Sequence, residues 1–308
     1  MAAVTAGMVK ELREMTGAGM MDCKKALANT DGDMDKAVEY LRENGMAKAA
    51  KKAGRIAAEG IVKVLVEGDK AAIVEVNSET DFVAKNADFN AYVDSVVAQA
   101  LNTTATDIDA FLAESWAAEP SKTVADELAS QIAIIGENLK IRRFAQIKAE
   151  NGFVASYIHM GGKIGVLVDV ETDVINDDVR EMAKNVAMQA AALKPVYTNR
   201  DEVDADYIAK ETEILTAAAK NEKPDANDKI IEGMVKGRIS KELKEICLLD
   251  QVYVKAEDGK QSVSAYVAQV AKANNANIKI KSFVRFETGE GLEKKNEDFA
   301  AEVAAQLG

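Results

Sequence analysis

The chain contains a single histidine, His159, which is the natural starting point for any catalytic hypothesis. A histidine can move protons near neutral pH when carboxylates or a nucleophile stand beside it. The sequence holds no G-x-x-x-x-G-K-[ST] phosphate loop, no G-x-S-x-G elbow and no H-E-x-x-H pair. Acid-base work by His159 with scattered carboxylates is therefore the only enzyme hypothesis, and it rests on a poor inventory.

A second candidate is the run Thr80-Asp81-Phe82-Val83, which stands between a predicted strand at residues 71–76 and a predicted helix. Threonine and aspartate cap helices because their side-chain oxygens accept a bond from an unpaired backbone N–H. Asp81 is explained by capping alone. An aromatic ring at the mouth of a helix is hard to bury, so we predict that Phe82 enters another protein; a place in the chain's own core is the alternative.

Charge limits the kinds of partner. The 308-residue chain has a net charge of −12, whereas a nucleic-acid binder must replace the cations around the phosphates with lysine and arginine. A short basic stretch, residues 48–55, lies in an alanine-rich predicted helix and is interpreted as a solvated face or a linker. We therefore expect no direct nucleic-acid contact.

The cysteines and the hydropathy pattern indicate the compartment. Cys23 and Cys247 are far apart and too few for a disulfide framework or a metal cluster. The sequence shows no basic-plus-apolar signal segment and no apolar run of about 18 residues. We expect a soluble cytoplasmic protein with reduced thiols, no membrane contact, no metal and no cofactor.

Residues 1–54 predict a small module of three helices, the third spanning residues 34–44. Met20 and Met21 are adjacent at a helix start and point about 100° apart, so we expect at least one to be exposed. Methionine suits adaptable binding surfaces, although two core methionines are an equal alternative. Because a module of this size has a marginal core, we expect it to dock on a larger body.

The remainder contains an internal repeat. A shift of 92 residues places Glu79-Thr80-Asp81 on Glu171-Thr172-Asp173 without a gap, which predicts the same helix cap in both copies. The segment around Asn138 matches that around Asn277 at a shift of 139, so the second copy contains 47 extra residues. We predict an α+β fold with two small antiparallel sheets and their helices, the first repeat at 55–147 and the second at 148–287.

The differences between the copies indicate where function lies. The alignment places Val174 where the first copy has Phe82, so the scaffold does not require the ring. It also places His159 in a strand-to-strand turn, where we expect an exposed contact. The extra residues, at about 199–245, predict an antiparallel helical hairpin for self-association or partner docking, with packing against its own domain as the alternative.

Two long motifs resemble those of one known family. Residues 12–27, LREMTGAGMMDCKKAL, and residues 75–85, EVNSETDFVAK, are similar to the signature segments of the bacterial elongation factor Ts family. Residues 286–291 and 298–303 resemble its C-terminal module, so the likeness runs from end to end.

The resemblance implies a nucleotide exchange factor for elongation factor Tu. It implies a ubiquitin-associated-like module at 1–54, a duplicated core, a coiled-coil hairpin and a C-terminal helical module at 288–308. In that family the corner that contains Asp81 and Phe82 enters the partner's GTP-binding domain and disturbs its magnesium site. The histidine matching His159 presses on another part of that domain and helps to displace the phosphate-binding loop. The positions matching Arg13, Met20 and Met21 dock on the same domain.

Two other classes remain open from the residues. A general interaction adaptor built on the N-terminal module would bind its partner through residues 1–54 alone. An enzyme would lose turnover on replacement of His159 without any partner protein.

Overall fold

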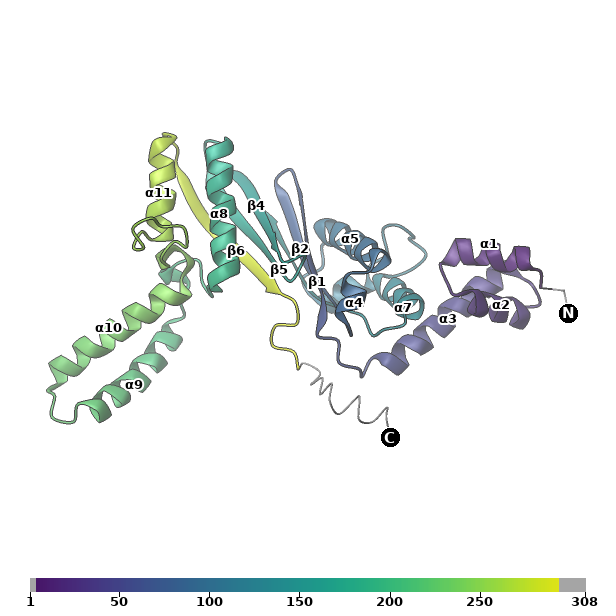
Figure 1. Ribbon diagram of the computed structural model, residues 1–308, viewed down its shortest axis with the longest axis horizontal. Helices are drawn as coiled ribbons and strands as arrows, with labels where there is room; N and C mark the ends of the chain where they lie inside the picture. The colour runs from purple at the N-terminus through teal and green to yellow at the C-terminus, as the bar shows by residue number, and fades with distance from the viewer. Residues whose placement is uncertain (1–3, 294–308) are drawn as a thin grey trace.

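Two three-stranded antiparallel sheets form the centre of the computed structural model, which describes residues 4–293 (Figure 1). The first sheet has the order β1 (Glu59–Glu67), β2 (Lys70–Ser78) and β3 (Lys140–Lys148). The second has the order β4 (Gly152–His159), β5 (Ile164–Thr172) and β6 (Ile278–Glu287). The α+β class predicted from the sequence is confirmed. The segments 286–291 and 298–303 were both assigned to a C-terminal module, and the second lies outside the described residues.

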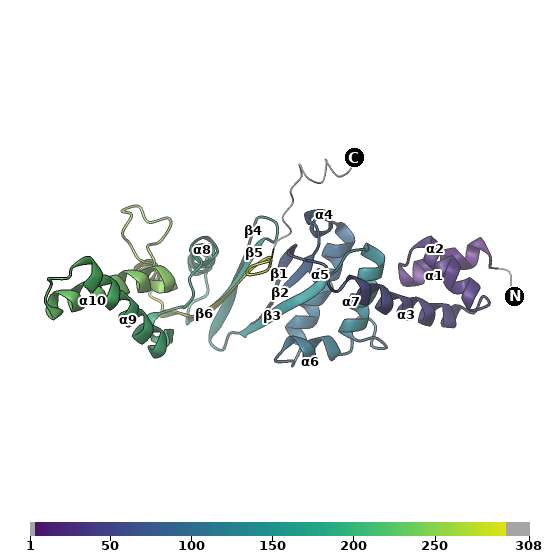
Figure 2. The ribbon, with the colours of Figure 1, turned by 90° about the horizontal axis from the view of Figure 1, so that it is seen from below.

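The sheets stack face to face, with helices on the two outer faces (Figure 2). Side chains alternate along each strand, so Ile61 packs under the helices of the first unit while Val62 packs against the second sheet. The first sheet is covered by α4 (Asp81–Ala84), α5 (Ala87–Asn102), α6 (Ile108–Ala113) and α7 (Val124–Ile135). The second is covered by α8 (Asp177–Leu193) and α11 (Val263–Ala273). Each unit therefore has its own core, and a third core joins them.

The N-terminal helices are α1 (Ala6–Thr16), α2 (Met20–Asn29) and α3 (Met34–Lys52). The predicted end of the third helix at residue 44 is wrong, because α3 continues and packs along α7. A Cβ at Gly45 would lie at an ordinary contact distance of 3.7 Å from the carbonyl oxygen of Ala129, so α3 and α7 are in direct contact here. Arg42 pairs with Asp126 of α7 at 2.5 Å. The three helices are thereby packed on the larger body, as expected.

The residues between β5 and β6 include two long helices, α9 (Ala205–Glu222) and α10 (Asp228–Ile246), which run antiparallel and project from the sheets (Figure 1). Short 3-10 turns flank them, η1 (Arg200–Glu202) and η2 (Leu248–Asp250). The pair buries a small core of its own, with Ala219, Ile231 and Val235 at its centre. The predicted helical hairpin is present, and its alternative, packing back on its own domain, is not observed.

The first hairpin turns of the two sheets differ in length. Glu67 pairs with Lys70 across a two-residue turn, whereas His159 pairs with Ile164 across four residues. The gap-free alignment of the repeats is therefore wrong beyond this turn. β2 corresponds to β5 at a shift of 94 residues, since the strands end at Ser78 and Thr172. An even shift keeps each side chain on its original face, so the apolar pattern conceals it.

Two shared irregularities support this correspondence. The ladder to the third strand shifts register between Glu75 and Val76 in the first sheet and between Asp169 and Val170 in the second. Asn138 donates its backbone N–H to Glu79 at 2.6 Å, and Asn277 donates its own to Asp173 at 2.8 Å. Both pairs of positions fit shifts of 94 in the second strand and 139 in the third.

Candidate functional site

The corner between β2 and α5 presents an aromatic side chain to solvent. Phe82 lies in the four-residue helix α4 and is 81% exposed. The alternative that placed this ring in the core is wrong. Val83, its neighbour, packs against the core of the first unit and anchors the corner. The exposed ring therefore stands on a fixed base.

The cap of α4 is Thr80, and the interpretation of Asp81 as a cap is wrong. The hydroxyl of Thr80 accepts a hydrogen bond from the N–H of Val83 at 3.3 Å. Asp81 follows as the first helical residue and pairs with Lys85 at 2.6 Å. That bond from Lys85 is the main reason why the pKa of Asp81 is lowered. We refer to Thr80 and α4, residues 80–84, as the tip. Beside the ring, the tip presents the carboxylate of Asp81, which stays ionised.

The second unit has no counterpart of α4 between its sheet and its helix. Residues 173–176 lead directly from β5 to α8, which Asn176 caps. The predicted Thr-Asp cap in this copy is wrong: the Thr172 hydroxyl binds the carbonyl of Val174, and Asp173 holds Asn277. In the first unit residues 79–86 span the same connection and include α4. Val174 does not replace Phe82; the whole tip is an addition to the first unit.

His159 is the last residue of β4, so its predicted place within the turn is wrong by one position. It is exposed, and its Nδ1 lies 2.9 Å from the Tyr157 hydroxyl. Met160 follows with a φ of 48° and is 72% exposed. The end of β4 and the β4–β5 turn, residues 160–163, therefore expose an imidazole at His159 and a thioether at Met160.

The tip and this turn lie at the same end of the stacked sheets. Val62 of β1 donates its N–H to the carbonyl of Gly162 at 2.7 Å, which fixes the turn against the first sheet. Lys163 pairs with Glu59, and its positive charge is close enough to contribute to the lowered pKa of Asp81. Two segments far apart in sequence are thus brought together.

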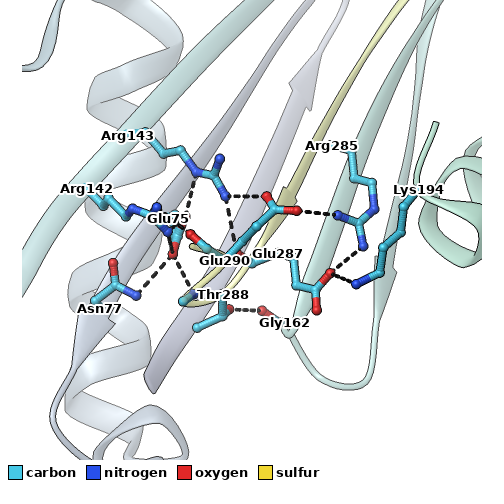
Figure 3. A network of polar contacts seen from close by, with 11 residues as sticks. Glu75, Asn77, Arg142, Arg143, Gly162, Lys194, Arg285, Glu287, Thr288 and Glu290 are labelled. Atoms are coloured by element: carbon cyan, nitrogen blue, oxygen red, sulfur yellow. Dashed lines mark hydrogen bonds and ion pairs between the residues drawn. The ribbon is translucent and has the colours of Figure 1, made fainter. Parts of the chain in front are cut away.

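A network of buried charged groups lies next to the β4–β5 turn (Figure 3). Glu75 of β2 is fully buried, with its carboxylate 3.0 Å from Arg142 Nη1 and 2.6 Å from Arg143 Nε. It also accepts the N–H of Gly289 at 2.8 Å. A buried carboxylate is tolerated here because two guanidinium groups, a backbone donor and the Asn77 amide at 3.1 Å satisfy it.

The chain after β6 completes this support (Figure 3). Thr288 donates its N–H to the carbonyl of Lys163 at 2.9 Å and its hydroxyl to that of Gly162 at 3.1 Å. Arg143 donates to the carbonyl of Glu287 at 3.2 Å. Sequence reasoning missed this network, although one signal was present: a glutamate inside an otherwise apolar predicted strand.

The N-terminal site residues lie on a separate surface at one end of the elongated molecule (Figure 1). Met20 is 61% exposed and Met21 is 73% exposed, so the alternative of two core methionines is wrong. With Arg13 they line a cavity of about 410 Å³, whose lining also includes Lys10 and Lys24. A cavity with apolar and basic lining fits a partner segment of mixed apolar and acidic character.

Within residues 4–293, no helix combines the length and apolar character needed to cross a bilayer. The same residues contain no group of three or more histidine, cysteine, aspartate or glutamate side chains placed to hold a metal ion.

The fold and site define the class of protein: a scaffold of two stacked antiparallel sheets that presents an exposed aromatic tip. The elongation factor TS family model matches residues 79–290. The chain is 56% identical over 309 residues to elongation factor Ts of Clostridioides difficile (strain 630), covering all of both chains. It is 52% identical to those of Clostridium botulinum (strain Eklund 17B / Type B) and Clostridium tetani (strain Massachusetts / E88), covering 99% of each. The chain belongs to the elongation factor Ts family and is a translation elongation factor, not an enzyme. The acid-base hypothesis for His159 is excluded.

Proposed function

We propose that this chain binds elongation factor Tu and promotes release of GDP by inserting Asp81 and Phe82 into its GTP-binding domain. One observation carries the proposal: an 81% exposed phenylalanine stands on a short helix that the first unit has and the second unit does without. Insertion of this ring into a partner would remove its apolar surface from water, which is favourable.

The proposed contact has three parts. Thr80 to Val83 form the wedge, which disturbs the magnesium and phosphate sites of the GTPase. His159, at the end of β4 beside the wedge, presses on a second part of the same domain. Arg13, Met20 and Met21 dock on that domain from the N-terminal helices, for which we propose the ubiquitin-associated-like fold.

The remaining finer assignments belong to the same proposal. The core arose by duplication, and α9 and α10 form the coiled-coil hairpin. The C-terminal module expected at 288–308 lies outside the described residues from residue 294 onward. We propose domains at 1–54, 55–147 and 148–287, with the hairpin inserted in the third of these.

Thermodynamic linkage supplies the mechanism. If the chain and GDP each favour a different arrangement of the GTPase site, their coupling is unfavourable and reciprocal, so binding of one weakens the other. A tenfold loosening of GDP requires about 1.4 kcal/mol of coupling. Burial of one phenylalanine contributes about 1.5–3 kcal/mol before ordering costs. Several contacts must therefore act together, and no catalytic group is needed.

The test is release of fluorescent GDP from purified elongation factor Tu, followed by stopped-flow with increasing amounts of the chain. Phe82→Ala should lower the maximal release rate by about 10- to 100-fold, from the burial energy of the ring. Ile175→Ala is the matched control, because it removes a 47% exposed apolar side chain from the corresponding corner of the second unit. Equal rates for Phe82→Ala and the unaltered chain would refute the proposed wedge.

An adaptor that works through the N-terminal module alone is the second candidate, and the cavity beside Met20 and Met21 is the observation that favours it. It predicts that the chain binds elongation factor Tu without changing the rate of GDP release. The same stopped-flow experiment separates the two functions.

A further inference from the structure

The turn that follows α7 grips the base of the aromatic tip. Gly136 ends α7 with a φ of 89°, a left-handed conformation that turns the chain toward the corner. The carboxylate of Glu137 then accepts three hydrogen bonds: from the N–H of Glu79 at 3.0 Å, the N–H of Thr80 at 3.1 Å and the Thr80 hydroxyl at 2.6 Å. One half-buried side chain therefore satisfies the backbone just before α4.

These bonds fix the residue that starts the tip. Thr80 receives the N–H of Val83 while its own hydroxyl donates to Glu137, so the orientation of the cap is set by the glutamate. α4 has only four residues, and so short a helix is not stable on its own. The direction in which Phe82 projects, two residues after Thr80, thus depends on Glu137.

The second unit shows what the scaffold requires without a tip. The asparagine that follows this turn holds an acidic side chain in both units, through Asn138 in the first and Asn277 in the second. The residue before that asparagine differs: it is Glu137 in the first unit and Ala276 in the second. The second unit, which lacks α4, has alanine at this position. The shared fold therefore does not require the glutamate, which is found only in the unit that has the tip.

We propose that Glu137 is a positioning residue, which sets the direction of Phe82 for insertion into the GTPase. The inference rests on the proposed exchange function and deepens it. Glu137 does not itself contact the GTPase; it acts only through its hydrogen bonds to the corner at residues 79–83. Removing it leaves the ring present but poorly directed.

The test compares Glu137→Ala and Glu137→Gln with Glu127→Ala, which removes another half-buried carboxylate, on α7 itself, that pairs with Lys122 rather than the corner. With fluorescent GDP on elongation factor Tu, Glu137→Ala should lower the maximal release rate about tenfold, which corresponds to about 1.4 kcal/mol. The concentration of chain at half-maximal rate should stay within about twofold, since the N-terminal helices dock separately. Glu137→Gln keeps an acceptor oxygen and should restore most of the rate.

A double variant shows whether Glu137 acts through the ring. If it does, Glu137→Ala in a Phe82→Ala background should slow release no further, a non-additivity expected of coupled residues. Hydrogen exchange of the free chain, read by mass spectrometry, should show faster exchange of residues 79–85 in Glu137→Ala and not in Glu127→Ala. This readout needs no partner.

Three outcomes overturn the inference: additive loss in the double variant, an unchanged rate in Glu137→Ala, or a loss that Glu137→Gln fails to restore and that follows a lowered thermal midpoint. If Phe82→Ala itself leaves release unchanged, the proposed function fails. If Phe82→Ala slows release and Glu137→Ala does not, only the positioning role fails.

Discussion

The two core units share a scaffold and differ in what each adds to it. Both have three antiparallel strands, a register shift beside an acidic residue and an asparagine-held carboxylate at the sheet-to-helix corner. The first unit adds α4 with Phe82 to that corner. The second adds the α9–α10 hairpin between its own helix and its last strand.

The comparison teaches that a feature present in both units serves the fold, and one present in a single unit serves something else. A repeat thus acts as an internal control for function. The buried Glu75 network is the instructive exception, because its counterpart position in the second unit, Asp169, is acidic but lacks equivalent partners.

The largest expected effect comes from disrupting the Glu75 network, which is found only in the first unit. Glu75→Gln should lower the free energy of unfolding by about 3–5 kcal/mol, because it leaves Arg142 and Arg143 without their buried counter-charge. Urea unfolding followed by circular dichroism measures it. A loss below about 1 kcal/mol would show that the two guanidinium groups find water or Glu290 instead.

Asp169→Asn is the matched variant in the second unit. Burial raises the pKa of Asp169, so the ionised form opposes folding at neutral pH. The variant should therefore be slightly more stable than the unaltered chain at pH 7, by less than about 1 kcal/mol. This gain should vanish as the pH falls below about 4, where the unfolded carboxyl is also protonated. A loss of stability at pH 7 would contradict the assigned difference between the units.

A chimera tests the sheet-to-helix corners directly. Replacing residues 79–86 with the sequence of residues 173–176, together with Glu137→Ala, gives the first unit the connection of the second. Exchange on elongation factor Tu should fall by at least about 100-fold, or about 2.7 kcal/mol, because the whole tip is lost. The far-ultraviolet circular dichroism spectrum should remain that of a folded chain. Unfolding of this chimera would show that α4 serves the scaffold after all.

The sequence predicted the tip better than it predicted the repeat. Phe82 was recognised because its neighbours have a local explanation and an aromatic ring at a helix mouth does not. The two-residue slip between the units was invisible, since an even shift leaves apolar alternation unchanged and the extra residues lie in a turn. The extension of α3 was missed because a glycine is typical of a helix end, whereas Gly45 is buried within α3, which packs along α7. The partners of Glu75 lie at residues 142–143 and 289, a pairing that local pattern does not contain.

Alanine substitutions at two corresponding glycines, Gly60 and Gly152, should destabilise the two units equally. Gly60 and Gly152 have φ of 119° and 151°, and a side chain at either would lie within 2.2 Å of a carbonyl oxygen on the neighbouring strand. Alanine at either position should lower the free energy of unfolding by about 2–3 kcal/mol, from backbone strain and the contact. Gly68→Ala is the control, with a φ of 61° but open space, and should lose about 1 kcal/mol. Unequal losses at Gly60 and Gly152 would weaken the equivalence of the units.

The smallest expected effect concerns the hairpin, the addition of the second unit. Its buried residues pack on one another, so removing residues 211–239 and joining the helix stumps with a short glycine linker should change core stability by less than about 1 kcal/mol. Ile214 and Ile230 are about half exposed at 51% and 49%, which is the surface that self-association or docking on elongation factor Tu would cover. Sedimentation velocity of the full and shortened chains, alone and with that partner, should show fewer chains per particle only where the hairpin is in contact. The same number of chains per particle in both settings would show that the hairpin has no role in association, and it would then be an addition to one unit with no binding function.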